Sequence, residues 1–429
     1  MRAGSRLRPS CAGRERRKSG SASCALGPAI RRRSLGGKPL ASACGGERHS
    51  GALAPEPKTP DPSDPMALRC GIVGLPNVGK STLFNALTAA GIAAENYPFC
   101  TIEPNAGVVP VPDPRLAALD AIVHSARIVP ATVEFVDIAG LVRGASKGEG
   151  LGNQFLSHIR ETQAIVQVVR CFEDTNVVHV EGGIDPIRDI ETIETELGLA
   201  DIDTVERRLD RAQRTARSGA KGAREEAAFF SGLLSHLSAG RPARTYPAPG
   251  EMEGALRECF LLTGKPVLYV ANVDEGSLAK GNAQTTKVES RAREEGARVV
   301  RLCAKIEAEL AELDAAEKAA FLHDLGVDEP GLHRLVREAY ALLDLITFFT
   351  AGPKEVRAWT IRRGTLAPAA AGEIHTDFER SFIRAEVISY TDYIAQGGEG
   401  GAKAAGAMRV EGKEYVVRDG DVVHFRVGV

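Results

Sequence analysis

The fold is decided by the stretch Gly74-Leu75-Pro76-Asn77-Val78-Gly79-Lys80-Ser81. It matches G-x-x-x-x-G-K-[ST], follows an apolar run and opens a helical pattern at 81–90, which is the context that a phosphate-binding loop requires. Backbone N–H groups of such a loop face phosphate oxygens, and the helix N-terminus adds its positive end. We expect Lys80 to bridge the outer phosphates as a catalytic residue and the Ser81 hydroxyl to ligate Mg²⁺. The stretch predicts a P-loop nucleoside triphosphatase.

Apolar runs on both sides of this loop indicate the buried parallel strands of one sheet. They lie at 70–75, 131–138, 164–172, 266–273 and 297–304. Helical patterns alternate with them, so we predict an α/β fold, a GTPase-like doubly wound sheet.

A long helical pair interrupts this pattern. Residues 186–240 combine helical periodicity with dense charge, which favours a coiled-coil arm projecting from the sheet and inserted at about 186–262. The alternative is that these helices merely pack on the sheet.

The C-terminal part has a different character. After a helix at about 330–345 we expect short strands at 356–361, 415–417 and 422–427, and a helix over 375–383. This predicts a small α+β module, separate from the sheet domain. The predicted scheme is a disordered extension at 1–65, a G domain at 66–345 and the module at 346–429.

The extension differs in charge from the rest of the chain. Residues 1–65 carry 13 Lys and Arg against 5 Asp and Glu, whereas the remainder carries 41 basic and 51 acidic side chains. An acidic body argues against nucleic-acid contact over the whole surface, so any such contact must be local. The extension fits a start placed too early, a transit peptide or a nucleic-acid-binding arm; we favour Met66 as the natural start.

Bulk composition excludes several classes of protein. No apolar run approaches the ~18–20 residues of a membrane helix. The eight cysteines lack metal-type spacing, which fits a reducing cytosol. We therefore expect a cytoplasmic protein that makes no membrane contact.

Two further elements strengthen the nucleotide prediction. Asp137-Ile138-Ala139-Gly140 ends the second predicted strand as a D-x-x-G motif. There Asp137 would hold the Mg²⁺ shell through water, and the Gly140 N–H would sense the γ-phosphate. Thr101, in a Pro-bounded loop, can complete the Mg²⁺ shell as a first switch.

The base-binding motif is unusual. GTP-specific proteins of this class end a later strand with N-K-x-D, whereas here the strand ends in Asn272-Val273-Asp274-Glu275. The carboxylate is one methylene longer, and adenine offers no N1–H or 2-amino group to a carboxylate. The change therefore predicts loss of guanine discrimination.

With these motifs the chain resembles the YchF subfamily of the Obg family, the Obg-like ATPases. The resemblance rests on 74–81, 96–105, 137–152, 272–275 and 303–309, and the stretches 375–378, 382–386 and 412–425 resemble a TGS domain. It implies a G domain interrupted by a helical arm, then TGS, with ATP preferred over GTP and association with ribosomes. It further implies that Ser81 and Thr101 bind Mg²⁺, that Asn272 with Val273 reads the base, and that the nucleotide is contacted by Asn77, Val78, Gly79, Lys80, Ser81 and Thr82.

Turnover has to proceed without the glutamine that orients water in Ras-like enzymes, because Leu141 stands at that position. The family pattern suggests His179 in this role; an ordinary loop histidine is the alternative. In related GTPases lacking the glutamine, a P-loop Asn ligates K⁺, so Asn77 either binds that ion or only shapes the loop. Cys100 belongs to the family pattern, and we expect it to be an unreactive thiol.

Together these features predict a slow Mg²⁺-dependent ATPase, monomeric, that acts as a nucleotide-gated switch on the ribosome. The ribosome would be contacted through the C-terminal module and the arm. Two other functions stay open: a GTP-specific translation GTPase, and a ribosome- or RNA-binding protein whose nucleotide is structural.

Overall fold

The structure is a computed structural model that describes 69–92, 105–138, 151–174 and 183–428, with only the backbone described at 90–92 and 151–154. The chain divides into two compact units, Met1–Asp61 and Pro62–Val429, and every described residue lies in the second. Among these residues no helix combines the length and apolar character needed to cross a membrane.

The first sheet carries the predicted strands. Its order is β2-β4-β1-β5-β6-β7. The five predicted strands are confirmed as β1 (Arg69–Val73), β4 (Thr132–Asp137), β5 (Ala164–Arg170), β6 (Val267–Asn272) and β7 (Arg298–Leu302), all in parallel pairing. The sixth strand, β2 (Ala106–Pro110), pairs antiparallel with β4 and was not predicted. It is a short edge strand that contains glycine and ends in proline, residues that are unfavourable inside a strand.

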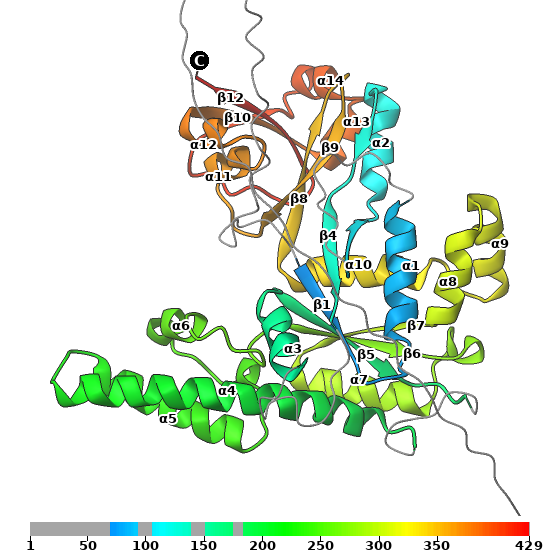
Figure 1. Ribbon diagram of the computed structural model, residues 1–429. Coiled ribbons are helices and arrows are strands. Elements are labelled where there is room, and N and C mark those ends of the chain that lie inside the picture. Colours follow the sequence, from blue (N-terminus) through cyan, green and yellow to red (C-terminus); the bar gives the residue numbers. More distant parts are fainter. Residues whose placement is uncertain (1–68, 93–104, 139–150, 175–182, 429) are drawn as a thin grey trace, which may run out of the picture. The chain divides into compact units, whose positions relative to one another are not determined.

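Helices cover both faces of this sheet (Figure 1). On one face lie α1 (Lys80–Ile92), α8 (Ala304–Glu312) and α10 (Gly331–Leu342), and on the other lie α7 (Ala283–Glu295) and the first half of α4 (Pro186–Arg217). The remaining helices of this part are α2 (Pro114–Val123), α3 (Leu151–Arg160), α6 (Gly250–Arg257) and α9 (Ala315–Asp324). The prediction of a doubly wound sheet is confirmed.

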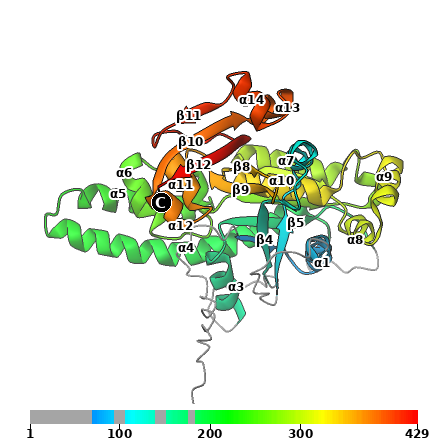
Figure 2. The ribbon, with the colours of Figure 1, turned by 90° about the horizontal axis from the view of Figure 1, so that it is seen from above.

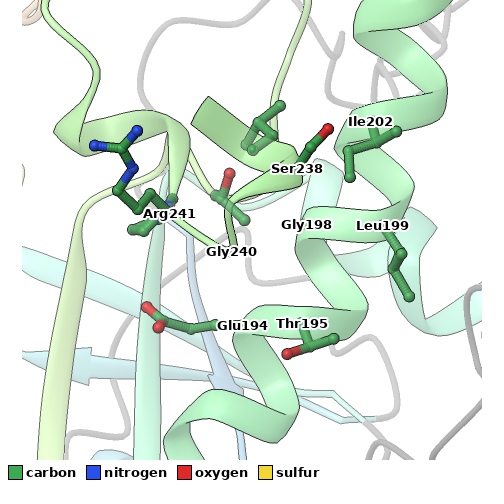
Figure 3. A pocket seen from close by; sticks show the side chains of 11 residues that line it. Glu194, Thr195, Gly198, Leu199, Ile202, Ser238, Gly240 and Arg241 are labelled. Carbon is green, nitrogen blue, oxygen red and sulfur yellow. The ribbon is translucent and has the colours of Figure 1, made fainter. Parts of the chain in front are cut away.

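The helical arm consists of α4 and α5 (Ala223–Ser238), which run side by side (Figures 1 and 2). Both sequence interpretations hold, each for one half of α4. Its first half, with Ile190 and Ile193, belongs to the core of the sheet. Its second half, with Val205 and Leu209, packs on α5 in a separate apolar cluster. Near the change of partners, a cavity of about 140 Å³ lies between α4 and the turn after α5 (Figure 3).

A second sheet forms the C-terminal module, in the order β11-β10-β12-β8-β9-β3. Its strands are β8 (Leu345–Ala351), β9 (Val356–Arg362), β10 (Phe382–Ser389), β11 (Arg409–Glu411), β12 (Asp421–Val427) and the two-residue β3 (Ile128–Val129). Its helices are α11 (Ala367–Gly372), α12 (Thr376–Arg380), α13 (Tyr390–Ala395) and α14 (Glu399–Ala404).

Two local predictions for the module are wrong. The helix expected over 375–383 ends at Arg380, because β10 begins at Phe382 and continues the sheet. The segment 415–417 forms only one isolated bridge, Leu366 with Val416, instead of a strand. In both places pairing with a distant strand decides the conformation.

The module is also less separate than the sequence suggests. β3, which precedes β4 in the chain, pairs with β9 of the module. Phe349, Ile388 and Val422 of the module belong to the same apolar core as the first sheet. The two parts therefore share a sheet and a core.

Candidate nucleotide site

The P-loop joins β1 to α1 and takes the backbone form that the glycines predict. Asn77 and Gly79 have φ of +64° and +93°, and the Leu83 N–H donates to the Gly79 carbonyl at 3.0 Å to start the helix. A Cβ on Gly79 would lie 2.3 Å from Nδ2 of Asn272. Only glycine fits there without moving a buried side chain.

Two charged residues meet at the carboxyl end of the sheet. Lys80 follows β1, Asp137 ends β4, and the two strands are parallel neighbours with Ile72 opposite Asp137. The Lys80 ammonium and the Asp137 carboxylate form an ion pair, and their side chains are mostly buried. The structure thus brings together two predicted site residues that stand far apart in the sequence.

The oxygen donors beside this pair suit a magnesium ion. Ser81 and Thr82 are exposed in the first turn of α1, immediately after Lys80. A hydroxyl and a carboxylate are the ligand types that Mg²⁺ prefers. The residues present therefore fit the ion that the fold implies.

Asn272 connects the loop to the neighbouring strand end. Its Nδ2 donates to the Val78 carbonyl at 2.9 Å, and its Oδ1 accepts from the Ala304 N–H at 2.9 Å. The residue is 4 % exposed. Both polar ends of this buried amide are thus bonded to backbone, so Asn272 fixes the P-loop against the start of α8.

The other residues of the unusual motif diverge in exposure. Val273 is buried, and its N–H donates to the Leu302 carbonyl at 2.9 Å. Asp274 accepts from the Ser277 N–H at 2.9 Å and so caps a short 3₁₀ turn, Glu275–Ser277. Glu275 is exposed. Of the two positions that differ from N-K-x-D, only the glutamate offers its side chain to solvent.

Sequence reasoning missed Glu307. This carboxylate is buried in α8 and accepts from the backbone N–H groups of Gly331 and Leu332, at 2.7 and 3.3 Å. Burial raises the pKa of Glu307, although these bonds favour the ionised form. It caps α10, whose own N-cap position is Pro330. Proline cannot cap a helix with its side chain, so Pro330 at the start of α10 was the signal that a residue distant in sequence provides the cap.

Burial affects the thiols of three cysteines in the first sheet domain. Burial raises the pKa of Cys70 and of Cys171 to about 12, and it also raises the pKa of Cys303 at the start of α8. Such thiols stay protonated at neutral pH.

Several predicted site residues lie outside the described residues. They are Thr101, Gly140 and His179, together with Cys100 and Leu141. Their roles remain predictions.

A P-loop between a parallel strand and a helix, with a lysine–aspartate pair at the adjoining strand end, defines the class of P-loop nucleoside triphosphatases with the GTPase-like fold. A family model described as "50S ribosome-binding GTPase" matches 69–205. The C-terminal model of YchF proteins, described as "Protein of unknown function (DUF933)", matches 345–428.

The particular family follows from similar full-length proteins. The chain is 59% identical to the ribosome-binding ATPase YchF of Haemophilus influenzae over 364 residues, which cover 85% of this chain and 100% of that protein. It is 55% identical to the protein of the same name from Bacillus subtilis over 366 residues, again 85% of this chain and 100% of that one. The solved YchF GTPase of Schizosaccharomyces pombe matches with 39% identity and a TM-score of 0.77, covering 84% and 98%. The chain belongs to the YchF family, as its motifs predicted.

Proposed function

We propose that this protein binds ATP in preference to GTP, hydrolyses it slowly with Mg²⁺, and acts as a nucleotide-gated regulatory switch on the ribosome in the cytoplasm. The observation that carries the nucleotide preference is the strand end Asn272-Val273-Asp274-Glu275. With Val273 buried, no cation stands where GTP-specific proteins have lysine. In GTP-specific proteins an aspartate pairs with guanine N1–H and N2–H₂, which adenine lacks. The longer Glu275 is poorly suited to this pairing, so guanine loses its advantage over adenine.

The names of relatives support the proposal without deciding the nucleotide. The bacterial relatives are named ribosome-binding ATPases, and the Schizosaccharomyces pombe relative is named a GTPase. We extend ribosome association and ATP hydrolysis to this chain on that similarity and on the P-loop.

In the proposed mechanism the chain supplies positioning and charge. Backbone N–H groups of 77–82 hold the phosphates, and Lys80 turns from Asp137 to the outer phosphates. Ser81 and, through water, Asp137 would hold Mg²⁺, which would supply positive charge to neutralise the phosphates. We also propose K⁺ at Asn77, for which faster turnover in potassium than in sodium at equal ionic strength is the test. We further propose that Thr101 completes the Mg²⁺ shell, that the Gly140 N–H contacts the γ-phosphate and that His179 orients the attacking water.

Side-by-side titration of the full chain with ATP and GTP tests the preference. We expect ATP to bind about tenfold more tightly, which is ~1.4 kcal/mol. Glu275→Asp should raise GTP affinity, because the shorter carboxylate matches guanine. Glu294→Asp, an exposed change on α7, is the matched control and should alter neither affinity. GTP binding as tight as ATP binding by the unaltered protein would refute the preference.

A further inference from the structure

The module's sheet opens between two of its strands. β12 and β8 are parallel neighbours, yet their register contains the single pair Val422 with Phe349. β8 ends at Ala351, and a turn closed by the Gly352 N–H on the Glu355 carbonyl at 3.1 Å leads into β9. β12 continues to Val427, and over its last residues it pairs only with β10 in the described part of the chain. Figure 1 shows β12 and β8 diverging.

A cavity of about 640 Å³ occupies the opening. The end of β8 and its turn, 350–355, line one side, and 422–425 of β12 line the other. Its remaining walls come from two different apolar clusters. Trp359 and Phe378 belong to the module's own core, whereas Tyr393 and Met408 belong to the core shared with the first sheet. We name this cavity the β12 cleft.

We propose that the β12 cleft binds an extended segment of a partner protein, which adds a strand to β12. Successive peptide groups of a strand point to opposite sides, so beyond Val422 alternate groups of β12 point into the cleft. Such groups are matched by the backbone of another extended chain. At about 3.3 Å per residue, the stretch 423–427 offers room for a segment of roughly five residues.

The walls specify the side chains of that segment. Alternate side chains of a strand face opposite sides, so one set would meet Trp359 and Phe378 and the other would meet Tyr393 and Met408. An apolar segment fits these walls better than a polar one. Aromatic walls add favourable contact with β-branched or aromatic partners.

The mouth of the cleft adds a charge preference. A carboxylate oxygen of Glu386, a carboxylate oxygen of Glu399 and a ring nitrogen of His424 lie within 4.8 Å of one another. Glu386 is already compensated by Arg426 at 2.8 Å and Arg384 at 3.4 Å. Glu399 is exposed and interacts electrostatically with Arg426, but it forms no ion pair with another described residue. A Lys or Arg beside the apolar residues of the segment would complement Glu399.

The chain carries its own probe for this site. Trp359 is the only tryptophan in the sequence, lines the cleft and donates from Nε1 to Thr350 Oγ1 at 2.9 Å. Titration of the full chain with the peptide acetyl-Lys-Val-Thr-Val-Thr-Val-Lys-amide should change its emission saturably. The same peptide methylated on alternate backbone nitrogens keeps its side chains but loses backbone N–H donors. It should therefore bind at least about tenfold more weakly.

Charge variants test the orientation at the mouth. Glu399→Lys should weaken the lysine peptide and strengthen one with glutamates at its ends. Glu414→Lys, a change at another exposed glutamate outside the cleft, should alter neither. No change in Trp359 emission at millimolar peptide, or equal binding of the methylated peptide, would overturn the proposal. So would concentration-dependent dimerisation that changes Trp359 emission without peptide, since a second copy would then fill the cleft.

Discussion

Asn272 shows how one buried side chain can hold the parts of a site together. Its amide bonds to the Val78 carbonyl on one side and to the Ala304 N–H on the other, and it also leaves no space for a Cβ at Gly79. These contacts fix the P-loop against β6 and α8. Nucleotide affinity should depend on this contact whichever base is bound.

We predict that Asn272→Asp lowers the affinity for ATP and GTP alike by about tenfold or more, because a carboxylate cannot donate to the Val78 carbonyl and leaves buried acceptors facing each other, a cost of ~1–3 kcal/mol. Titration with both nucleotides measures the effect. Asn282→Asp is the matched control, since Asn282 also donates to a backbone carbonyl, that of Cys171, at 2.7 Å. Equal losses of affinity in the two variants would count against a specific role for Asn272.

At the scale of elements, the arm is attached to the sheet by a mostly buried charge cluster. Glu194 of α4 pairs with Arg244 and, at 2.8 Å, with Arg291 of α7. Glu295 accepts from Arg244 at 2.5 Å and from the Tyr269 hydroxyl of β6 at 3.0 Å. Figure 3 shows Glu194 on its helix next to Thr195, at the cavity beside the turn after α5. The arm is thus joined to the strand that ends in Asn272.

A second contact fixes the same region. Asp201 of α4 is buried and accepts from the N–H groups of Leu262 and Thr263, both at 2.8 Å, and from the Thr263 hydroxyl at 2.6 Å. Burial raises the pKa of Asp201, against the effect of these bonds. Leu262 and Thr263, where the chain returns from the arm, are therefore hydrogen-bonded to α4 at the point where α4 leaves the sheet.

We predict that Arg244→Leu destabilises the protein by about 1–3 kcal/mol, because the mostly buried Glu194 and Glu295 each lose one of their two arginine partners. Urea unfolding followed by circular dichroism measures the loss. Arg257→Leu is the control, since Arg257 is exposed and its ion pair with Glu253 is 3.7 Å long; its effect should stay within about 0.5 kcal/mol. A small loss for Arg244→Leu would show that the cluster is not stabilising.

The same cluster gives a pH dependence of known sign. Burial opposes ionisation of Glu295, but Arg244 and Arg291 hold its pKa below the ordinary value of 4.5. Its contribution to stability is therefore fully present above pH 4.5. It is lost as the pH falls through the pKa of Glu295 in the folded protein, which lies below 4.5. The difference in stability between the unaltered protein and Arg244→Leu should shrink over that range.

The outer arm is where we expect ribosome contact, because its charge differs from that of the acidic body. Between 206 and 225, more exposed side chains are basic than acidic. The basic ones are Arg207, Arg211, Arg214, Arg217, Lys221 and Arg224, and the acidic ones are Glu206, Asp210 and Glu225. A local basic surface attracts RNA phosphates even on an acidic protein.

We predict that Arg211→Glu with Arg214→Glu weakens co-sedimentation with ribosomes at least about tenfold and reduces its salt dependence, because fewer counterions are released. ATP affinity should not change. Lys287→Glu with Arg293→Glu, two exposed positions on α7, makes the same charge change away from the arm tip and should leave sedimentation intact. Equal weakening in both double variants would indicate a general charge effect.

On the scale of the whole molecule, the G domain and the C-terminal module are one packed body. Arg115 of α2 pairs with Asp419 at 2.7 Å, and its guanidinium lies 4.9 Å from the centre of the Phe349 ring. Arg127 pairs with Glu355 at 2.5 Å beside the β3–β9 pairing. We propose that the boundary between the G domain and the C-terminal module lies near residue 345. Deleting the module would expose shared core, so point substitutions are the better test of its role.

We predict that a protein beginning at Met66 keeps the melting temperature and ATP affinity of the full chain. The Haemophilus influenzae relative aligns over its whole length with 364 residues, and the stretch from Met66 to Val429 has the same length. Calorimetry and ATP titration of both forms measure the outcome. A lower melting temperature or weaker binding without 1–65 would show that the extension contributes to the fold.

The local sequence by itself determined the P-loop, the five parallel strands and the helical arm. Each of these follows from periodicity or from residues close in sequence: a glycine-rich turn between strand and helix, short apolar runs, and a 3.6-residue repeat. Asp137 could be predicted as a candidate site residue because its D-x-x-G motif ends a parallel strand, and Asn272 because its motif resembles that of the YchF subfamily. The P-loop itself could therefore be predicted from the sequence alone.

Only the tertiary structure decided the contacts between distant segments. The pairing of β3 with β9, the cap that Glu307 provides for α10 and the Arg244 cluster each join residues with no pattern relating them in sequence. The same holds for the double role of α4, whose even periodicity does not reveal that its partner changes from the sheet to α5. Periodicity shows which face of an element is buried, whereas what covers that face depends on how the whole chain packs.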